Sequence, residues 1–117
     1  ESEREGHDIG GGIARASIGS TTVWLKGGSA PSHGHADLSS VAVAHRDNWI
    51  VGDPGTGTYN GPLEIRNYFR SSIAHSVTRV EGLDQLEPHR AFRWIYRAHG
   101  VVGKPVAIAP AIRNAIR

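Results

Sequence analysis

The sequence predicts an all-β fold formed by a single domain, either an antiparallel, sandwich-like sheet or an open sheet. Short runs of β-branched and aromatic residues recur at a spacing of roughly 8–12 residues, and clusters of Gly, Pro, Asn and Asp separate them. A length of 117 residues allows one domain with one core. Contents of 38% hydrophobic and 21% charged residues are ordinary for a globular protein, so composition does not oppose that assignment.

The first predicted hairpin joins residues 13–18 to residues 21–26 across the turn signal Gly19-Ser20. A polar, glycine-rich lead-in, residues 1–11, precedes it. We expect the β-sheet domain to span residues 12–109 and the remaining residues, 110–117, to form a tail that favours no single structure.

A second hairpin is predicted from residues 38–45 and 49–52, with Arg46-Asp47-Asn48 as the turn. Residues 54–62 are rich in Gly and Pro and therefore predict a loop. A short helix is expected at 63–69, because Pro62 suits the first turn of a helix.

Three further strands are predicted at residues 76–80, 92–98 and 101–109. In the second of these, Phe92, Trp94 and Tyr96 alternate mainly with charged residues, which places the aromatic side chains on one face. We expect this aromatic row to belong to the core.

Charge and composition exclude several classes of function. The net charge is only +2 and no run of basic residues stands out, which argues against nucleic acid as a partner. No apolar run approaches the roughly 20 residues that span a membrane, so no membrane partner is expected. The chain has no Cys, so a metal site must use His and carboxylate ligands.

The concentrated chemistry lies in His33-Gly34-His35, followed by Asp53 at the end of a predicted strand. In an extended backbone, residues two apart point to the same face, so both imidazoles can face one pocket. They then supply either two metal ligands or one ligand and one acid or base. The predicted hairpin brings Asp53 back toward them.

Other polar residues have weaker claims. Asp37 is expected to accept hydrogen bonds from loop amides or to orient a histidine from outside the ligand shell. Arg66 and Arg70 can pair with sugar carboxylates, although surface salt bridges are the commoner role of such residues. Tyr59, in a Gly/Pro-rich loop, is expected to serve packing.

Four ordered motifs together carry a family resemblance. They are SHGHADLSS at 32–40, VGDPGTGTYNG at 51–61, RNYFRSSIAHS at 66–76, and RVEGLDQLEP at 79–88 followed by FRW at 92–94. With them in this order, the chain resembles the C-terminal β-sheet region of the heparinase II/III-like polysaccharide lyases.

The resemblance implies an N-terminal α-helical toroid followed by a β-sandwich, in an enzyme that cleaves acidic polysaccharides by β-elimination. It further implies that His35, Asp53 and His75 bind Zn²⁺ and that His33 faces the substrate cleft. There, His33 would neutralise a uronate carboxylate or transfer a proton. The catalytic tyrosine would come from the helical domain, and the location would be the bacterial periplasm or outside the cell.

Two departures from the family pattern stand out: Ser76 replaces an Asn after the metal histidine, and residues 103–117 show no family motif. The sequence contains no Met and opens on charged residues without a signal peptide, so we expect a piece of a longer, processed protein. The helical domain of that protein is then a partner of this chain, and the chain alone is expected to be inactive.

Two other functions were weighed. His33-x-His35-x-Asp37 matches the opening of the H-x-H-x-D-H signature of metallo-β-lactamase-like hydrolases, but Leu38 occupies the position of the last histidine. That reading is discarded. The second alternative is a non-catalytic, metal-stabilised β module that binds acidic glycans without cleaving them.

Overall fold

A computed structural model of the chain describes residues 5–8, 12–29, 33–96 and 99–100. Its largest feature is an antiparallel five-stranded sheet with the strand order β1-β2-β3-β5-β6. The strands are β1 (Glu5–Asp8), β2 (Ile13–Ile18), β3 (Thr21–Lys26), β5 (Val41–His45) and β6 (Asn48–Val51). The predicted all-β, antiparallel class is therefore confirmed.

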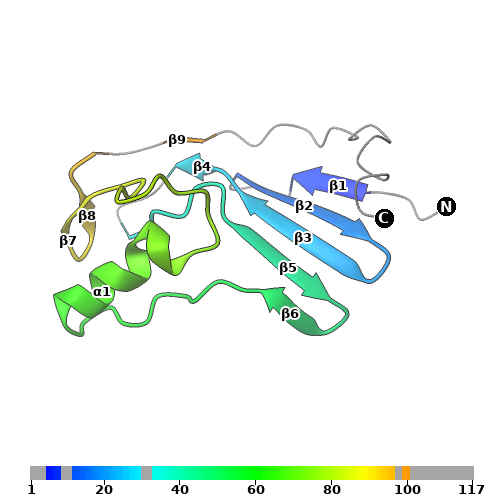
Figure 1. Ribbon diagram of the computed structural model, residues 1–117, viewed down its shortest axis with the longest axis horizontal. Coiled ribbons are helices and arrows are strands. Elements are labelled where there is room, and N and C mark those ends of the chain that lie inside the picture. The colour runs from blue at the N-terminus through cyan, green and yellow to red at the C-terminus, as the bar shows by residue number, and fades with distance from the viewer. Residues whose placement is uncertain (1–4, 9–11, 30–32, 97–98, 101–117) are drawn as a thin grey trace.

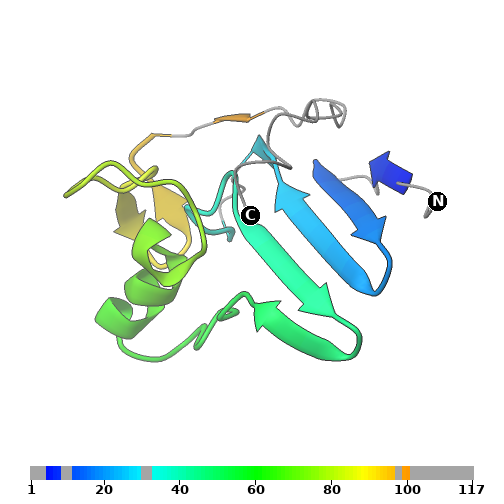
Figure 2. The same cartoon turned by 45° about the vertical axis from the view of Figure 1, so that its right-hand side comes forward.

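Smaller elements gather at one end of this sheet. They are β4 (Gly28–Ser29) paired with β9 (His99–Gly100), β7 (Pro88–Arg90) paired with β8 (Arg93–Trp94), the helix α1 (Leu63–Arg70) and the 3₁₀ turn η1 (Ser72–Ala74). Two views place α1 and the β7–β8 hairpin at the opposite end of the molecule from β1 (Figure 1, Figure 2). Among the described residues, no helix is long and apolar enough to cross a membrane.

The β2–β3 hairpin has the predicted bounds because its turn is specified locally. Ile18 pairs with Thr21, so only two residues connect the strands. Gly19 has a φ of +56°, a conformation that costs glycine little and most other residues much more. The turn therefore fixes the register of the whole hairpin.

The second hairpin begins later than predicted. Strand β5 starts at Val41 rather than at residue 38, because Ser39 has a φ of 66° and bends the backbone away from the sheet. Strand β6 covers residues 48–51 in place of the predicted 49–52. Of the residues that precede β5 and were predicted to belong to it, Leu38 is buried at the end of the histidine loop.

Helix α1 confirms the predicted helix and extends it by one residue. Pro62 precedes its first turn, where a missing N–H costs no hydrogen bond. Glu64 lies in the first turn and Arg70 in the last, an arrangement that suits the helix dipole. Its buried residues are Arg66 and Arg70, so this helix turns charged groups inward.

Several predicted elements need correction. Residues 5–8, assigned to the lead-in, form β1 and pair with β2. Residues 76–80 form no strand: the Ser76 carbonyl accepts one bond from Val41 N, and Val80 is exposed. Within 92–96, the described part of the strand predicted at 92–98, only the two residues of β8 form a strand. The predictions for 101–109 and 110–117 lie outside the described residues.

The buried apolar residues lie under the histidine loop rather than on the sheet. Ala36 and Leu86 are fully buried, Leu38 is nearly so, and Trp94 packs against the first two. Trp94 is thus a core residue, as predicted for the aromatic row, but Tyr96 is exposed. The second large sheet of a sandwich is not found among the described residues.

Candidate functional site

The segment that carries His33 and His35 is held by the end of α1 and by η1. Ala36 N donates a hydrogen bond to the Arg70 carbonyl at 2.7 Å. The Ser72 hydroxyl, which is buried, donates to the Ala36 carbonyl at 2.8 Å. Both groups of the Ala36 backbone are therefore satisfied, and the loop is fixed immediately beside His35.

Arg66 and Arg70, on helix α1, donate hydrogen bonds to the backbone of the same loop. Both side chains are fully buried, one helical turn apart. Arg66 Nη2 donates to the His33 carbonyl at 3.3 Å, and Arg70 Nε donates to the Gly34 carbonyl at 3.2 Å. Arg70 Nη1 also donates to the Arg90 carbonyl at 2.7 Å and so joins the loop to β7.

Aromatic rings cover these two guanidinium groups. The Arg66 guanidinium carbon lies 5.0 Å from the centroid of Tyr59 and 5.4 Å from that of Phe92, and Arg70 lies 4.0 Å from Trp94. Arg66 Nε and Nη1 have no hydrogen-bond partner in the described part of the chain. Cation–π contacts with the Tyr59 and Phe92 rings therefore offset part of the cost of burying this charge. Burial and the neighbouring Arg66 lower the pKa of Arg70 to about 10, which leaves it charged at neutral pH.

This burial bears on the expected roles of Arg66 and Arg70. A side chain without exposed surface has no access to a sugar carboxylate unless the loop above it opens. Their geometry favours a positioning role: they bind the backbone that presents His33 and His35.

A cluster of potential metal ligands lies beside this loop. One ligand atom each from His35, Asp37 and His75 lies within 4.8 Å of the others. The rings of His35 and His75 have centroids 5.1 Å apart. The structure therefore brings together two histidines that lie 40 positions apart, as expected, although the carboxylate in this group is Asp37 and not Asp53.

Asp53 joins the cluster through His75. Its Oδ2 lies 2.9 Å from His75 Nδ1, and its Oδ1 accepts a bond from Gly55 N at 2.8 Å. The Asp53 side chain is half exposed, whereas that of His75 is fully buried. A buried imidazole thus meets a carboxylate that also reaches solvent.

The hydrogen-bond partners of His75 favour a positive charge between its ring and Asp53. Its Nε2 lies 3.1 Å from the Phe69 carbonyl, which only accepts hydrogen bonds, so Nε2 must carry the proton. In the neutral ring, Nδ1 then presents a lone pair to the Asp53 carboxylate, which is also an acceptor. A proton on Nδ1 or a metal ion between the two groups resolves this conflict.

Imidazole nitrogens and carboxylate oxygens are ligands that zinc and other divalent transition metals accept. Two ligands of a tetrahedral zinc stand about 3.4 Å apart for bond lengths of about 2.0–2.2 Å, and Nδ1 and Oδ2 lie slightly closer than that. A histidine that ligates metal commonly donates its other N–H to a carbonyl, as His75 does to Phe69. The burial of His35, followed by the proximity of His75, lowers its pKa, which favours the neutral ring that binds metal.

Asp37 has a partner of its own. Lys26 Nζ lies 2.7 Å from its Oδ1 and 2.6 Å from its Oδ2, so both carboxylate oxygens are engaged. This bidentate ion pair compensates the buried charge without a metal. This contact is not one of those expected for Asp37, which were loop amides or a histidine, and its carboxylate also lies among the potential metal ligands.

His33 is exposed and lies apart from the cluster. Its ring stacks on Phe92, with centroids 4.6 Å apart and an angle of 28° between the planes. The Tyr59 ring also stacks on Phe92, with ring centroids 6.4 Å apart. The loop therefore gives its two histidines different surroundings: His35 borders the cluster and His33 faces solvent.

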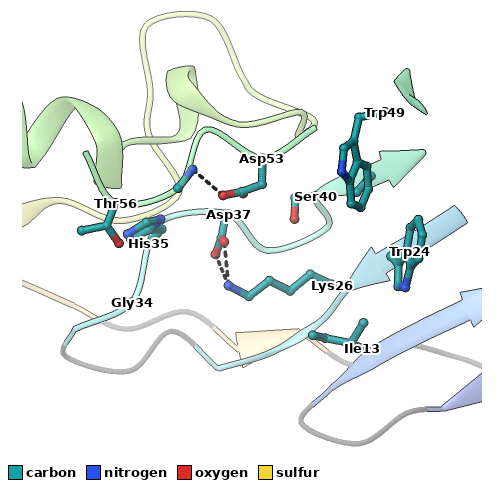
Figure 3. Close-up of a pocket in the computed structure, with 12 residues that line it drawn as sticks. Ile13, Trp24, Lys26, Gly34, His35, Asp37, Ser40, Trp49, Asp53 and Thr56 are labelled. Carbon is teal, nitrogen blue, oxygen red and sulfur yellow. Dashed lines mark hydrogen bonds and ion pairs between the residues drawn. The ribbon is translucent and has the colours of Figure 1, made fainter. Parts of the chain in front are cut away.

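A cavity of about 490 Å³ adjoins the cluster. His35, Asp37 and Asp53 line one end of it, and Trp24 and Trp49 line the other (Figure 3). Sequence reasoning placed the two tryptophans on strands but did not connect them with the site. The two lie in different predicted hairpins, and the pairing of β3 with β5, which places them on one face, had no signal in the sequence.

Comparison with known proteins agrees with this fold. The family model for the heparinase II/III-like C-terminal domain matches residues 3–109. The match starts within the expected lead-in and continues beyond residue 103, from which no family motif was recognised. Comparison with curated proteins and with solved structures found no match. Since the family model covers most of its length, the chain belongs to the heparinase II/III-like family, as a C-terminal domain of that family.

Proposed function

We propose that this chain is the β-sheet portion of a polysaccharide lyase that cleaves uronate-containing polysaccharides by β-elimination. Such a reaction removes the proton α to the uronate carboxylate and breaks the bond to the oxygen on the β carbon. The departing oxygen takes up a proton, and the product contains a carbon–carbon double bond. The observation that carries the proposal is the arrangement of one loop, which exposes His33 to solvent and places His35, two residues later, in a His/Asp cluster.

His33 is the residue of this chain that we assign to the substrate. Negative charge builds on the uronate carboxylate as its α proton leaves, and a protonated imidazole stabilises that charge. A histidine in this position can also act as a general acid or base in the proton transfer. Its contact with Phe92 and the bond from Arg66 to its carbonyl support a fixed orientation.

We assign a structural zinc ion to His35, Asp53 and His75. The unsatisfied arrangement between His75 and Asp53 supports this choice of carboxylate, because the charge of Asp37 is already compensated by Lys26. Bound there, the ion would join the loop at 35, the segment after β6 and the turn after α1. It would thereby limit the movement of His33.

The catalytic tyrosine is assigned to a helical domain of the same, longer protein, which acts in the periplasm or outside the cell. The chain alone is then inactive. A non-catalytic module that binds acidic glycans is the alternative, and it is supported by the same exposed histidine and by the absence of an assigned base from this chain.

The test is the formation of unsaturated uronate products, measured by ultraviolet absorbance, from heparin and from alginate. We expect no product from the 117-residue chain, and product from the longer protein that is strongly reduced by His33→Ala. His45→Ala, a change at another exposed histidine, serves as the control and should leave the rate unchanged. Product from the chain alone would refute its inactivity, and glycan binding without product from the longer protein would favour the module.

A further inference from the structure

The two faces of the five-stranded sheet differ in chemistry. The register of the strands places aromatic, charged and hydroxyl groups on one face, which we call the polar face: Arg15, Ser17, Thr22, Trp24, Lys26 and Trp49. The other face is mainly aliphatic and includes Ala14, Ala16, Ile18, Val23, Leu25 and Val43, with Thr21 and His45 at one end. An aliphatic face is the side that a sheet normally covers with another layer, which leaves the polar face for solvent or a ligand.

Two tryptophans form the centre of the polar face. The rings of Trp24 and Trp49 have centroids 5.2 Å apart and planes inclined by 42°. Trp49 is 64% exposed, so its position gains little from burial. The paired residues on β5 are Ala42 and Ala44, whose small side chains leave the indole faces open. The exposed face of an indole suits the C–H groups of a sugar ring, which are attracted to the negative face of the ring.

Basic side chains lie on both sides of the tryptophans, although the charge of Lys26 is paired with Asp37. Arg15 is exposed and is the cross-strand partner of Trp24, on the β2 side. Lys26 lies toward the histidine loop, where it binds Asp37. An arginine beside an aromatic platform provides a planar pair of donors for a carboxylate on the stacked sugar.

The platform and the candidate site share one cavity. Trp24 and Trp49 border it at one end and His35 and Asp53 at the other, with the Lys26 side chain extending between them (Figure 3). Its volume of about 490 Å³ lies in the range of small-molecule sites. The cavity therefore links the polar face to Gly34 and His35, which follow His33 in the same loop, although His33 itself does not line it.

We propose that Trp24 and Trp49 form a sugar-stacking subsite for an acidic oligosaccharide, in which Arg15 binds a uronate carboxylate. This subsite rests on the proposed function, because it extends the same substrate beyond the histidine loop. It has no part in the chemical step. Its effect is on affinity, through the sugar units distant from His33.

The experiment measures binding of heparin and alginate hexasaccharides to the 117-residue chain by isothermal titration calorimetry, with maltohexaose as a neutral sugar. Trp49→Ala should weaken binding of an acidic hexasaccharide by about tenfold, as for an aromatic contact at the centre of an interface. Arg15→Gln should weaken it less, and the loss should shrink at high salt. Ile50→Ala is the matched control, because Ile50 is 65% exposed and adjacent in sequence.

Circular dichroism of each variant establishes that the fold is retained. Wild-type affinity in Trp49→Ala, with weaker binding in His33→Ala, would overturn the subsite and leave the proposed function intact. Equal affinity for maltohexaose would refute the acidic specificity of the subsite. Failure of the wild-type chain to bind either acidic hexasaccharide would contradict the substrate class of the proposed function, and the subsite with it.

Discussion

Replacing Asp53 by Asn separates the role of this residue as a metal ligand from its role as a hydrogen-bond partner. The asparagine oxygen can still accept the bond from Gly55 N, and its NH₂ group can donate to the lone pair of His75 Nδ1. We therefore expect the free energy of unfolding of the metal-free chain to change by less than about 0.5 kcal/mol. What Asn removes is the negative charge that a zinc ion needs.

The effect on zinc can be worked out. Loss of a residue that only orients a ligand costs roughly 10–100-fold in metal affinity, so loss of an anionic ligand should cost at least about 100-fold. With free zinc at about 100 times the wild-type Kd, binding stabilises the wild type by about 2.7 kcal/mol and the variant by only about 0.4 kcal/mol. The difference corresponds to roughly 10 °C in Tm for a domain of this size.

The assay is thermal unfolding of both proteins in zinc and in chelator, together with a competition titration against a chromophoric chelator. Asp37→Asn is the control: it breaks the ion pair with Lys26 and should lower the metal-free Tm, yet retain the rise in Tm with zinc. If Asp53→Asn bound zinc like the wild type and Asp37→Asn did not bind it, the assignment of Asp53 as the carboxylate ligand would be refuted.

Three further predictions concern stability, measured by urea unfolding of the metal-free chain. Gly57→Ala should destabilise more than Gly55→Ala: both positions have φ near +70°, which costs alanine about 1 kcal/mol, but only at Gly57 does the new Cβ overlap the Phe69 ring. Equal losses would contradict this. Arg70→Lys should cost roughly 3 kcal/mol, because an ammonium cannot reproduce the guanidinium's bonds to two separate carbonyls. A loss near zero would show that those bonds do not hold the loop. Burial lowers the pKa of His35 below its ordinary value of 6.5, so the unfolded chain binds a proton on this ring more tightly than the folded chain does. The free energy of unfolding should therefore be highest above about pH 6.5 and fall as the pH drops toward the pKa of the folded state. His35→Gln should flatten this dependence, and an unchanged slope would assign it to another group.

Local features of the sequence were sufficient to predict much of the sheet. The β2–β3 hairpin follows from alternation and a glycine turn, both of which act over neighbouring residues. The start of β5 was wrong because a bend at Ser39 depends on tertiary contacts of the loop. The strand predicted at 76–80 failed for a related reason, since its β-prone residues find no partner strand among the described residues.

The site was only partly predictable. The spacing of His33 and His35 predicted an extended segment with both imidazoles toward one pocket, but the segment turns there and only His35 lines the cavity. The family motifs added His75 and Asp53. Burial of Arg66 and Arg70 was not foreseen, because a helix normally turns arginine to solvent. The arginines are buried because the carbonyl groups of the histidine loop, which packs on the helix, accept hydrogen bonds from them. The residue pattern of the helix itself does not indicate that this loop packs there.

The most direct measurement of the central claim is anomalous diffraction at the zinc edge from crystals of the 117-residue chain grown with zinc. We expect one strong peak at bonding distance from a ring nitrogen of His35, from His75 Nδ1 and from a carboxylate oxygen of Asp53. No peak at these side chains, with His75 Nδ1 still hydrogen-bonded directly to Asp53 at saturating zinc, would contradict it.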